Sequence, residues 1–421
     1  MNETFYKKLT NGVQIVHRHS NSEVAYVGIM VGAGTRHEVP ELNGMAHYIE
    51  HCVFKGVMHD GKPLSAKQLI NRIEGIGGEI NAYTTKEETT FYAAVPRHYF
   101  ARTLRLISDM VLHPTFPKDE TDKEVSVILD EIESYNDSPS ELIYDDFESL
   151  IFDGSSLALP ILGTKKTLRH LSQKASYAHE WMQRNYLPER IVVFSQGHIP
   201  FQKIEEQVEE IFGNIPPTQS AGNNAVAHSL PCEITLDANH ASASYHKHTH
   251  QMHVMIGGKA YPLGHKRQLG MYLMNNILGG GSLSSLLNMS IREQKGLVYT
   301  IESQYTPLSD TGYWNIYFAS EPNHRQQCLD LIYAQLARLR ERPFTPRQLS
   351  HAIKQLHGQM AISAENQENN VLAMAKQMLY YGKAPDWQET FHQIEQFTPD
   401  DLQQIAIELM QEKSLFSLFY E

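Results

Sequence analysis

Two stretches far apart in this chain repeat the same order of elements, and the repeat limits the folds that the chain can adopt. The segment PTFPKDETDKEVSVILDEI begins at Pro114, and RPFTPRQLSHAIKQLHGQM begins at Arg342. Each follows an aromatic strand pattern and a long helical pattern, and each places a Phe and a Pro before an amphipathic helix. Aligning Phe116 with Phe344 gives an offset of 228 residues. We therefore expect a duplicated unit.

A segment rich in Pro, Asn, Gly and Ser separates the two halves. It reads NIPPTQSAGNNAVAHSLP over residues 214–231 and has no apolar periodicity, which is typical of a linker. The chain has 421 residues, whereas single hydrophobic cores usually stop growing at about 250 residues. We predict two domains, at residues 1–213 and 232–421, joined by residues 214–231.

Local patterns in the first half predict hairpins and helices. Residues 13–32 carry two β-branched runs around a polar HSNSE turn, and residues 79–95 alternate and are rich in Thr and Tyr. Both patterns predict β-hairpins. Apolar spacing predicts helices over about 41–57, 64–76, 97–112 and 118–135. Gly77 and Gly78 are expected to end the second of these helices.

The charge, hydropathy and cysteine content of the chain indicate which binding partners and which cellular compartment to expect. The net charge is −12 with His neutral, and an acidic protein repels nucleic acid and anionic membranes. An acidic surface that attracts cationic peptides is the other interpretation. The sequence contains no run of about 20 apolar residues, so we expect no membrane span. The first residues lack the pattern of a secretory signal. Cys52, Cys232 and Cys328 are few and widely spaced, so we expect no disulfide framework and a reducing, cytoplasmic location.

The sequence HYIEH, from His47 to His51, carries the clearest chemistry. Residues four apart lie on one face of a helix, so both imidazoles can reach one zinc ion. Glu50 lies between them, where its carboxylate suits a general base acting on zinc-bound water. Cys52 points about 100° away from His51 around the helix, and we interpret it as a packing residue. Because the chain has 22 His, an accidental pair is the alternative.

A second helical segment offers a third ligand. Glu124 and Glu131 are seven residues apart, two turns along one face, and the apolar run VSVIL lies between them. Glutamates that border such a run face a core with unpaired charge unless a cation is present. A solvated acidic face is the alternative, because Asp130, Glu133 and Asp137 are also present. Spacing alone leaves open which glutamate would bind the ion.

Taken in order, these motifs resemble those of the pitrilysin and insulinase family of zinc metallopeptidases, the inverzincins, in which the common HExxH order is reversed. The resemblance is greatest to short bacterial members and to the β subunit of the mitochondrial processing peptidase. It covers nearly the whole chain. The matching segments are LTNGVQIVHRHS, VGAGTRHEVPELNGMAHYIEHCVFKG, GGEINAYTTKEETTFYA, EVSVILDEI, PILGT and LGGGSLSSLLNMSIREQKGLVY.

The resemblance implies roles for the metal-site residues. His47, His51 and Glu131 are expected to bind one Zn²⁺ per chain, with Glu50 as the general base. Glu124 matches the family's second acidic residue on its helix and is expected to orient a ligand imidazole. The choice of Glu131 over Glu124 as the ligand comes from the family pattern.

The resemblance also implies residues that contact substrate. Arg292 and Tyr299, in REQKGLVY, match residues that donate to the oxyanion at the scissile carbonyl; outside this motif they would be interpreted as a surface Arg and a core Tyr. Asn81 and Ala82 match an edge strand to which the substrate adds as a β-strand. Phe54 is expected either to line the pocket for the residue after the cut or to belong to the core.

We therefore predict an α+β protein of two homologous α/β sandwich domains, each with a mainly antiparallel sheet covered by helices. The first domain carries the metal site, and the second supplies Arg292 and Tyr299. The predicted activity is zinc-dependent endopeptidase hydrolysis of unfolded peptides or short oligopeptides inside a clamshell chamber. The short chain implies a homodimer, and a heterodimer with an inactive homologue is the alternative.

Two other functions are the alternatives to this one. A non-catalytic scaffold or presequence-binding subunit keeps the fold but loses motif residues, whereas this chain retains all of them. A metal-dependent enzyme with a small-molecule substrate would need neither the INAYT edge strand nor the second-half Arg and Tyr. We expect a peptide partner, and neither nucleic acid nor a membrane.

Overall fold

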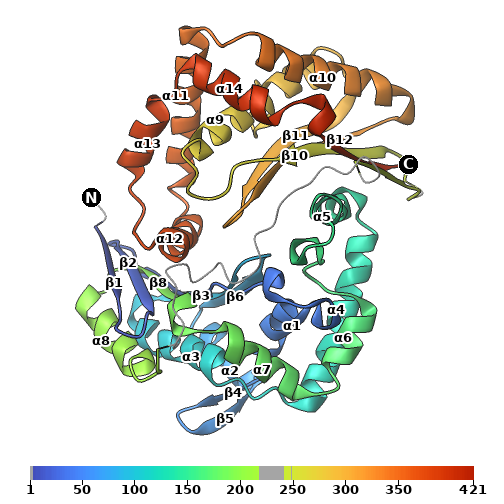
Figure 1. Ribbon diagram of the computed structural model, residues 1–421. Coiled ribbons are helices and arrows are strands. Elements are labelled where there is room, and N and C mark those ends of the chain that lie inside the picture. Colours follow the sequence, from blue (N-terminus) through green and yellow to red (C-terminus); the bar gives the residue numbers. More distant parts are fainter. Residues whose placement is uncertain (1–2, 218–240, 248) are drawn as a thin grey trace. The chain divides into compact units, whose positions relative to one another are not determined.

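The structure is a computed structural model that describes residues 3–217, 241–247 and 249–421. Most of the predicted linker, residues 218–231, and Cys232 lie outside the described residues. The chain divides into two compact units, each assembled from three segments (Figure 1). Unit 1 contains Met1–Ile132, Leu159–Leu230 and Ser363–Pro385; unit 2 contains Glu133–Ala158, Pro231–Ile362 and Asp386–Glu421.

A six-stranded sheet of order β1-β2-β8-β3-β7-β6 forms the centre of unit 1. Only the β2–β8 pair is parallel among its ladders. The strands are β1 (Thr4–Lys8), β2 (Gln14–His19), β3 (Val24–Val31), β6 (Glu79–Thr84), β7 (Thr89–Pro96) and β8 (Ile191–Gly197). Strand β6 forms one edge of this sheet.

The predicted hairpin over residues 79–95 is confirmed, and the one over residues 13–32 is wrong. Strands β6 and β7 pair directly as antiparallel neighbours. Strand β8 instead lies between β2 and β3 and pairs with both. The polar segment after His19 therefore connects β2 to a strand that is not its neighbour. The strand between them, β8, comes from about 170 residues further along the chain. Local alternation cannot show such an insertion.

Both faces of the unit 1 sheet are buried. On β3, Val27 and Ile29 face one core, and Met30 faces another, because alternate side chains of a strand point to opposite faces. The first face is covered by helices from the first half of the chain. The helices of that half are α1 (Met45–Cys52), α2 (Ala66–Glu74), α3 (Phe100–Leu112), α4 (Lys118–Asn136), α6 (Lys165–Leu171), α7 (Ala175–Asn185) and α8 (Phe201–Phe212), and a small ribbon is formed by β4 (Gly56–His59) and β5 (Lys62–Ser65).

Helix α12 (Gln367–Tyr381) comes from the second half of the sequence and covers the other face of the unit 1 sheet. Its Val371, Met374 and Met378 are almost fully buried in the core that contains Met30 and Phe194. Each large apolar side chain buried in this way stabilises the fold by about 1.5–3 kcal/mol. This cover buries the apolar side chains that β2, β3, β7 and β8 carry on that face of the sheet.

Unit 2 contains a five-stranded sheet of order β11-β12-β10-β13-β9, with the β13–β9 pair parallel and the other pairs antiparallel. This is the unit 1 topology without a counterpart of β1. The strands are β9 (Ser242–Tyr245), β10 (Met252–Lys259), β11 (Val298–Pro307), β12 (Gly312–Ser320) and β13 (Phe416–Tyr420). One face packs on α9 (Gln268–Gly279), α10 (Arg325–Glu341) and α14 (Pro399–Leu409), near which lie α11 (Pro346–Ser363) and α13 (Trp387–Glu395).

Helix α5 (Pro139–Ile151), from the first half of the sequence, covers the second face of the unit 2 sheet. Tyr313 and Tyr420 of the sheet donate to Glu148 and Asp146 of α5 at 2.5 and 2.7 Å. The two halves of the chain thus exchange covering helices, α5 for α12. The compact units therefore differ from the continuous ranges 1–213 and 232–421 expected from the sequence.

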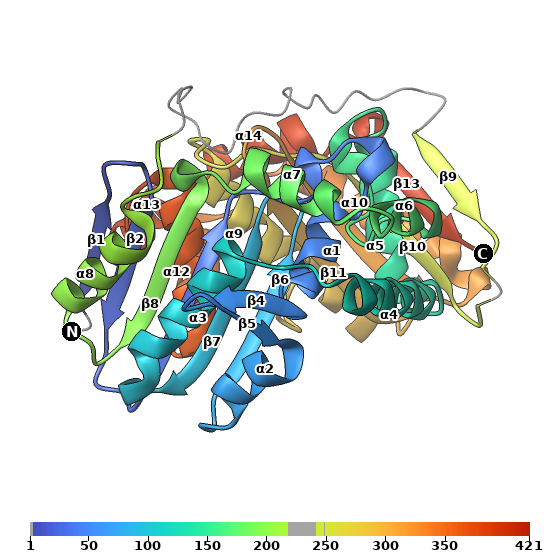
Figure 2. The same cartoon turned by 90° about the horizontal axis from the view of Figure 1, so that it is seen from below.

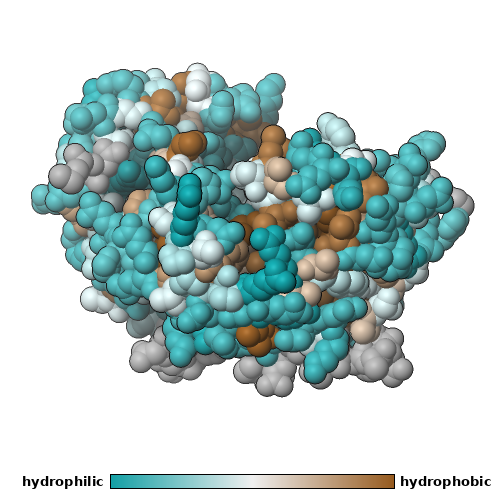
Figure 3. Space-filling model, turned by 90° about the horizontal axis from the view of Figure 1, so that it is seen from above, coloured by the Kyte–Doolittle hydropathy of each residue, from teal (hydrophilic) through white to brown (hydrophobic). Residues whose placement is uncertain are grey.

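The fold class is α+β with mainly antiparallel sheets, as the sequence predicts. In the view of Figure 2 the strands of the unit 1 sheet, with α1 beside β6, are seen from below. Hydrophilic side chains cover most of the face in Figure 3. Within the described ranges, no helix is long and apolar enough to cross a membrane.

Candidate metal centre

The start of α1 is fixed by two glycines and a buried carboxylate. Gly44, the residue before the helix, has φ of 90° and lies so close to Gly163 that a Cβ there would be 2.8 Å from the Gly163 Cα. Glu38 accepts hydrogen bonds from the backbone N–H groups of Gly44 and Ala46, both at 2.7 Å, and from the Asn43 amide at 2.9 Å. The carboxylate satisfies N–H groups that have no partner within the helix.

Helices α1 and α4 bring two imidazoles and one carboxylate together. The Glu131 Oε2 lies 3.7 Å from the His47 Nε2 and 3.6 Å from the His51 Nε2. One ligand atom from each of the three residues lies within 4.8 Å of the others. Across residues 3–217, 241–247 and 249–421, this is the one group of three or more His, Cys, Asp or Glu side chains with such convergence.

This donor set fits Zn²⁺. Ligands bound to a tetrahedral zinc ion at about 2.0–2.1 Å lie about 3.4 Å apart, close to the distances from Glu131 to the two histidines. Two His and one carboxylate are a recurrent ligand set of catalytic zinc sites, which leave the fourth position open. Burial and the neighbouring His51 lower the pKa of His47 to about 3, so this imidazole is neutral near pH 7 and has a lone pair for a metal.

His51 is oriented by a carboxylate and a lysine behind it. Its Nδ1 lies 3.1 Å from the Glu124 Oε2, and the other carboxylate oxygen lies 2.7 Å from the Lys55 Nζ. Only 9% of the Glu124 side chain is exposed. A carboxylate on Nδ1 places the proton there and leaves the Nε2 lone pair facing Glu131.

Glu50 lies on the same helix and is held by strand β6. The Thr84 hydroxyl donates to the Glu50 Oε2 at 2.6 Å. Burial raises the pKa of Glu50, with Glu131 acting in the same direction, while the Thr84 hydrogen bond and His51 oppose the shift. A carboxylate whose pKa is raised toward neutrality is a better proton acceptor near pH 7.

The residues expected to bind the substrate backbone lie on β6. Asn81 is exposed and Ala82 half-buried, and both pair with β7 on one side. Among the strands that the structure describes, none pairs with the opposite edge of β6. Phe54 is half-buried and packs against the unit 1 core. Its predicted pocket role stays a prediction.

Arg292 and Tyr299 lie in unit 2, at two irregularities of the backbone. Arg292 belongs to a π-helical turn, Asn288–Glu293, and Tyr299 lies at a register shift of β11 between Val298 and Thr300. Tyr299 is 79% exposed, and the Arg292 Cζ lies 5.9 Å from its ring centre. Short π-helices and β-bulges are frequent at functional sites, where they redirect side chains.

Three residues that support the site were not predicted from the sequence: Glu38, Lys55 and Thr84. All three lie within the motifs quoted above, so the signal was present without a role attached to it. The interpretation of Cys52 as a packing residue agrees with its fully buried position in the unit 1 core.

A reversed HxxEH helix, a glutamate from a following helix and an α+β scaffold define the class of sites found in zinc metallopeptidases. Comparison with known families gives the same class. The chain matches "Insulinase (Peptidase family M16)" over residues 14–165 and "Peptidase M16 inactive domain" over residues 175–356. The protein belongs to peptidase family M16, the insulinase and pitrilysin family.

Curated relatives and solved structures extend the similarity over the whole chain. The chain is 31% identical over 409 residues to the "Uncharacterized zinc protease YmxG" of Bacillus subtilis, covering 97% of this chain and 96% of that protein. A zinc protease of Streptomyces coelicolor is 28% identical over 403 residues, which cover 96% of this chain and 86% of that protein. The fold matches a protease from Helicobacter pylori with a TM-score of 0.88 at 20% identity, covering 100% of both chains. The fold also matches a peptidase M16 inactive domain from Pseudomonas fluorescens, with a TM-score of 0.84 at 16% sequence identity. The match covers 99% of this chain and 98% of that one.

Proposed function

We propose that this protein is a zinc-dependent endopeptidase that hydrolyses unfolded peptides. The observation that carries the proposal is the convergence of His47, His51 and Glu131, with Glu50 held beside them by Thr84. The names of the relatives, zinc proteases, support the metal and the reaction class. A non-catalytic subunit has no need for a complete ligand set with a carboxylate base beside it.

His47, His51 and Glu131 would hold the ion. Bound there, zinc would supply Lewis acidity toward the scissile carbonyl and would acidify a water molecule. Glu50 accepts the proton of the attacking water and then gives it to the leaving amine, so that the base returns to its starting state. Glu124 and Lys55 keep His51 oriented throughout.

The substrate backbone is proposed to add to the free edge of β6 beside Asn81 and Ala82. An exposed edge strand binds extended chains through main-chain hydrogen bonds, which favours unfolded peptides over folded proteins. We assign oxyanion donation to Arg292 and Tyr299, supported by the π-helical turn and the bulge that present them. Phe54, which packs against the unit 1 core, is proposed to contact the residue after the cut as well.

The assembly and compartment belong to the same proposal. It includes a homodimer that encloses a chamber, with a heterodimer with an inactive homologue as the alternative, and a cytoplasmic location, which the few, widely spaced cysteines favour. The molar mass in solution, measured by light scattering on protein expressed alone, distinguishes a dimer of this chain from a chain that needs a different partner.

The central experiment combines metal analysis with a peptide assay. Purified protein should contain about one zinc per chain and should cleave internally quenched peptides from a mixed library, with loss of cleavage after chelation and recovery after zinc is restored. Cleavage by zinc-free protein would exclude the proposal. Stoichiometric zinc with no cleavage of any peptide in the library would instead favour the non-catalytic alternative.

A further inference from the structure

Thr84 connects the proposed general base to the proposed substrate strand. It is the last residue of β6, two positions after Ala82, and its hydroxyl is 2.6 Å from the Glu50 Oε2. Alternate residues of a strand share a face, so Ala82 and Thr84 both point to the side of α1, where Ala82 packs against the unit 1 core. Tyr83 points the opposite way, toward α12, with the Lys376 Nζ 6.0 Å from its ring centre.

Helix α1 alone does not fix the Glu50 carboxylate. The helical backbone places the Glu50 Cα between those of His47 and His51, but three further side-chain torsions separate the carboxylate from that backbone. A side chain of this length retains substantial rotamer freedom unless a partner holds it. The Thr84 hydroxyl is such a partner, and a hydrogen bond to an ionised acceptor is stronger than one between neutral groups.

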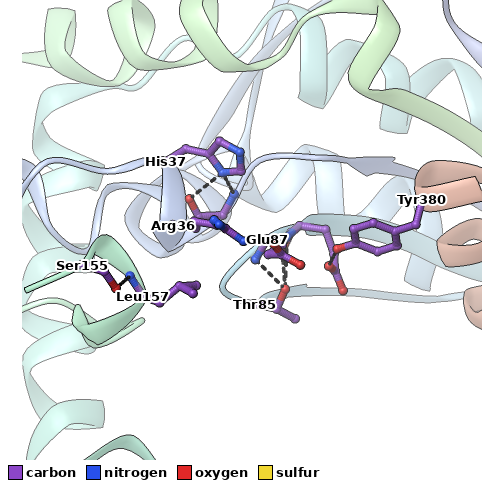
Figure 4. A network of polar contacts seen from close by, with 9 residues as sticks. Arg36, His37, Thr85, Glu87, Ser155, Leu157 and Tyr380 are labelled. Carbon is purple, nitrogen blue, oxygen red and sulfur yellow. Dashed lines mark hydrogen bonds and ion pairs between the residues drawn. The ribbon is translucent and has the colours of Figure 1, made fainter. Parts of the chain in front are cut away.

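The turn after Thr84 is itself locked in place (Figure 4). The Thr85 hydroxyl accepts from the backbone N–H groups of Glu87 and Glu88, and the Glu87 carboxylate pairs with Arg36 at 2.6 Å. Both side chains of this ion pair are at least 97% buried. The pair therefore resists displacement, because separating it would leave a buried charge without its partner.

Backbone contacts hold the same turn against the segment before α1. The Arg36 N–H donates to the Lys86 carbonyl at 2.8 Å, and a Cβ on Gly34 would lie 2.3 Å from the Thr85 carbonyl oxygen. On the other side, Tyr380 of α12 donates to Glu88. The turn is thus held from two directions, and the position of the Thr84 hydroxyl follows from it.

We propose that Thr84 is a positioning residue for Glu50, which holds the base in one orientation relative to the edge of β6. The proposal rests on the proposed peptidase function and adds a residue to it. The same strand carries the proposed substrate contacts and the hydroxyl. The position of Glu50 is therefore fixed relative to a peptide that pairs with β6. Loss of the hydroxyl should affect turnover and leave peptide binding and the metal in place.

The test uses Thr84→Val, which keeps the shape and removes the hydroxyl, and Thr84→Ser, which keeps the hydroxyl. We expect Thr84→Val to retain one zinc per chain and an unchanged KM while kcat falls about 10- to 100-fold, the size of one hydrogen bond to a charged group. Thr84→Ser should recover kcat to within about threefold. Thr103→Val in α3 is the matched control, since its hydroxyl donates to the Tyr99 carbonyl of its own helix region, and it should leave kcat unchanged.

A second measurement is independent of activity. In crystal structures of the zinc-loaded variants, the Glu50 carboxylate should leave its position beside residue 84 in Thr84→Val and keep it in Thr84→Ser. An unchanged kcat together with an unmoved Glu50 in Thr84→Val overturns the positioning role. Wild-type protein that binds zinc and cleaves no peptide would instead refute the proposed function. The orientation of Glu50 in the variant structures would still test whether Thr84 positions it.

Discussion

His51 and Glu124 are joined by a hydrogen bond between residues 73 positions apart, with 3.1 Å between Nδ1 and Oε2. Glu131, two turns further along α4, lies instead on the other side of the same imidazole, with its Oε2 3.6 Å from the His51 Nε2. Two glutamates of one helix thus contact opposite nitrogens of one ring. This arrangement assigns them different tasks, which mutation can separate.

Glu131→Gln should abolish stoichiometric zinc binding, because it removes the anionic ligand. Glu124→Gln should keep the metal and raise the zinc Kd about 10- to 100-fold, because it removes only the charge that orients His51. Competition with a chromogenic chelator measures both constants. Asp119→Asn, exposed on the same helix, is the control and should match the wild type. Equal losses in the Glu124 and Glu131 variants would contradict the division of tasks.

Lys55→Met should weaken zinc binding about 3- to 10-fold, because Lys55 holds the second oxygen of Glu124 and the freed carboxylate can turn away from His51. Lys55→Arg keeps the charge and should lie closer to wild type. Lys67→Met, an exposed lysine of α2, controls for the loss of one positive charge. A Lys55→Met protein with wild-type affinity would show that Glu124 needs no second partner.

Glu50→Gln should retain zinc and lose kcat/KM by about 10²- to 10⁴-fold, the usual contribution of a positioned acid–base group. The amide keeps the shape and cannot accept the proton of the attacking water. Metal analysis and the quenched-peptide assay on the same preparation give both values. Normal cleavage by this variant would assign the base to another residue.

Tyr299→Phe should lower kcat about 10²- to 10³-fold with little effect on zinc, because a single oxyanion donor is removed. The side chain is 79% exposed at a β-bulge, so the substitution should leave the stability of unit 2 unchanged. Tyr245→Phe, another exposed tyrosine of the same sheet, is the control. If both variants retain full kcat, Tyr299 contributes nothing to the transition state.

The convergence of the candidate metal ligands could be predicted because its signals are local. Residues four apart on a helix share a face, and this alone joins His47 with His51, as the seven-residue spacing joins Glu124 with Glu131. The supporting residues have no such signal. Thr84 reaches Glu50 across 34 positions, and Lys55 reaches a different helix, so their roles depend on tertiary structure.

The fold was predictable in class and less so in connectivity. Period-2 alternation correctly predicts β2, β3, β6 and β7 as strands, but it contains no information on the order of strands in a sheet, and β8 separates β2 from β3. The exchange of α5 and α12 is hidden for a similar reason. An amphipathic helix reveals that it has an apolar face and does not reveal which sheet will cover that face.

A buried histidine of β2, His17, gives a prediction for pH. Burial lowers the pKa of His17 to about 4, with His19 adding to the effect, and its Nδ1 lies 2.9 Å from the Ser195 hydroxyl. The unfolded chain takes up a proton near pH 6.5, whereas the folded one stays neutral down to about 4. The stabilising contribution is therefore complete above pH 6.5 and is lost as pH falls toward 4.

Between pH 7 and 5 this linkage should cost the wild type about 2 kcal/mol of unfolding free energy. His17→Gln cannot take up the proton, so its stability should fall by about 2 kcal/mol less over the same interval, whatever its stability at pH 7. Urea unfolding of unit 1 at both pH values, followed by fluorescence, measures the difference. His98→Gln changes an exposed histidine and should keep the wild-type pH dependence. Should His17→Gln lose as much stability as the wild type, the neutral imidazole in the core is not the source of the acid sensitivity.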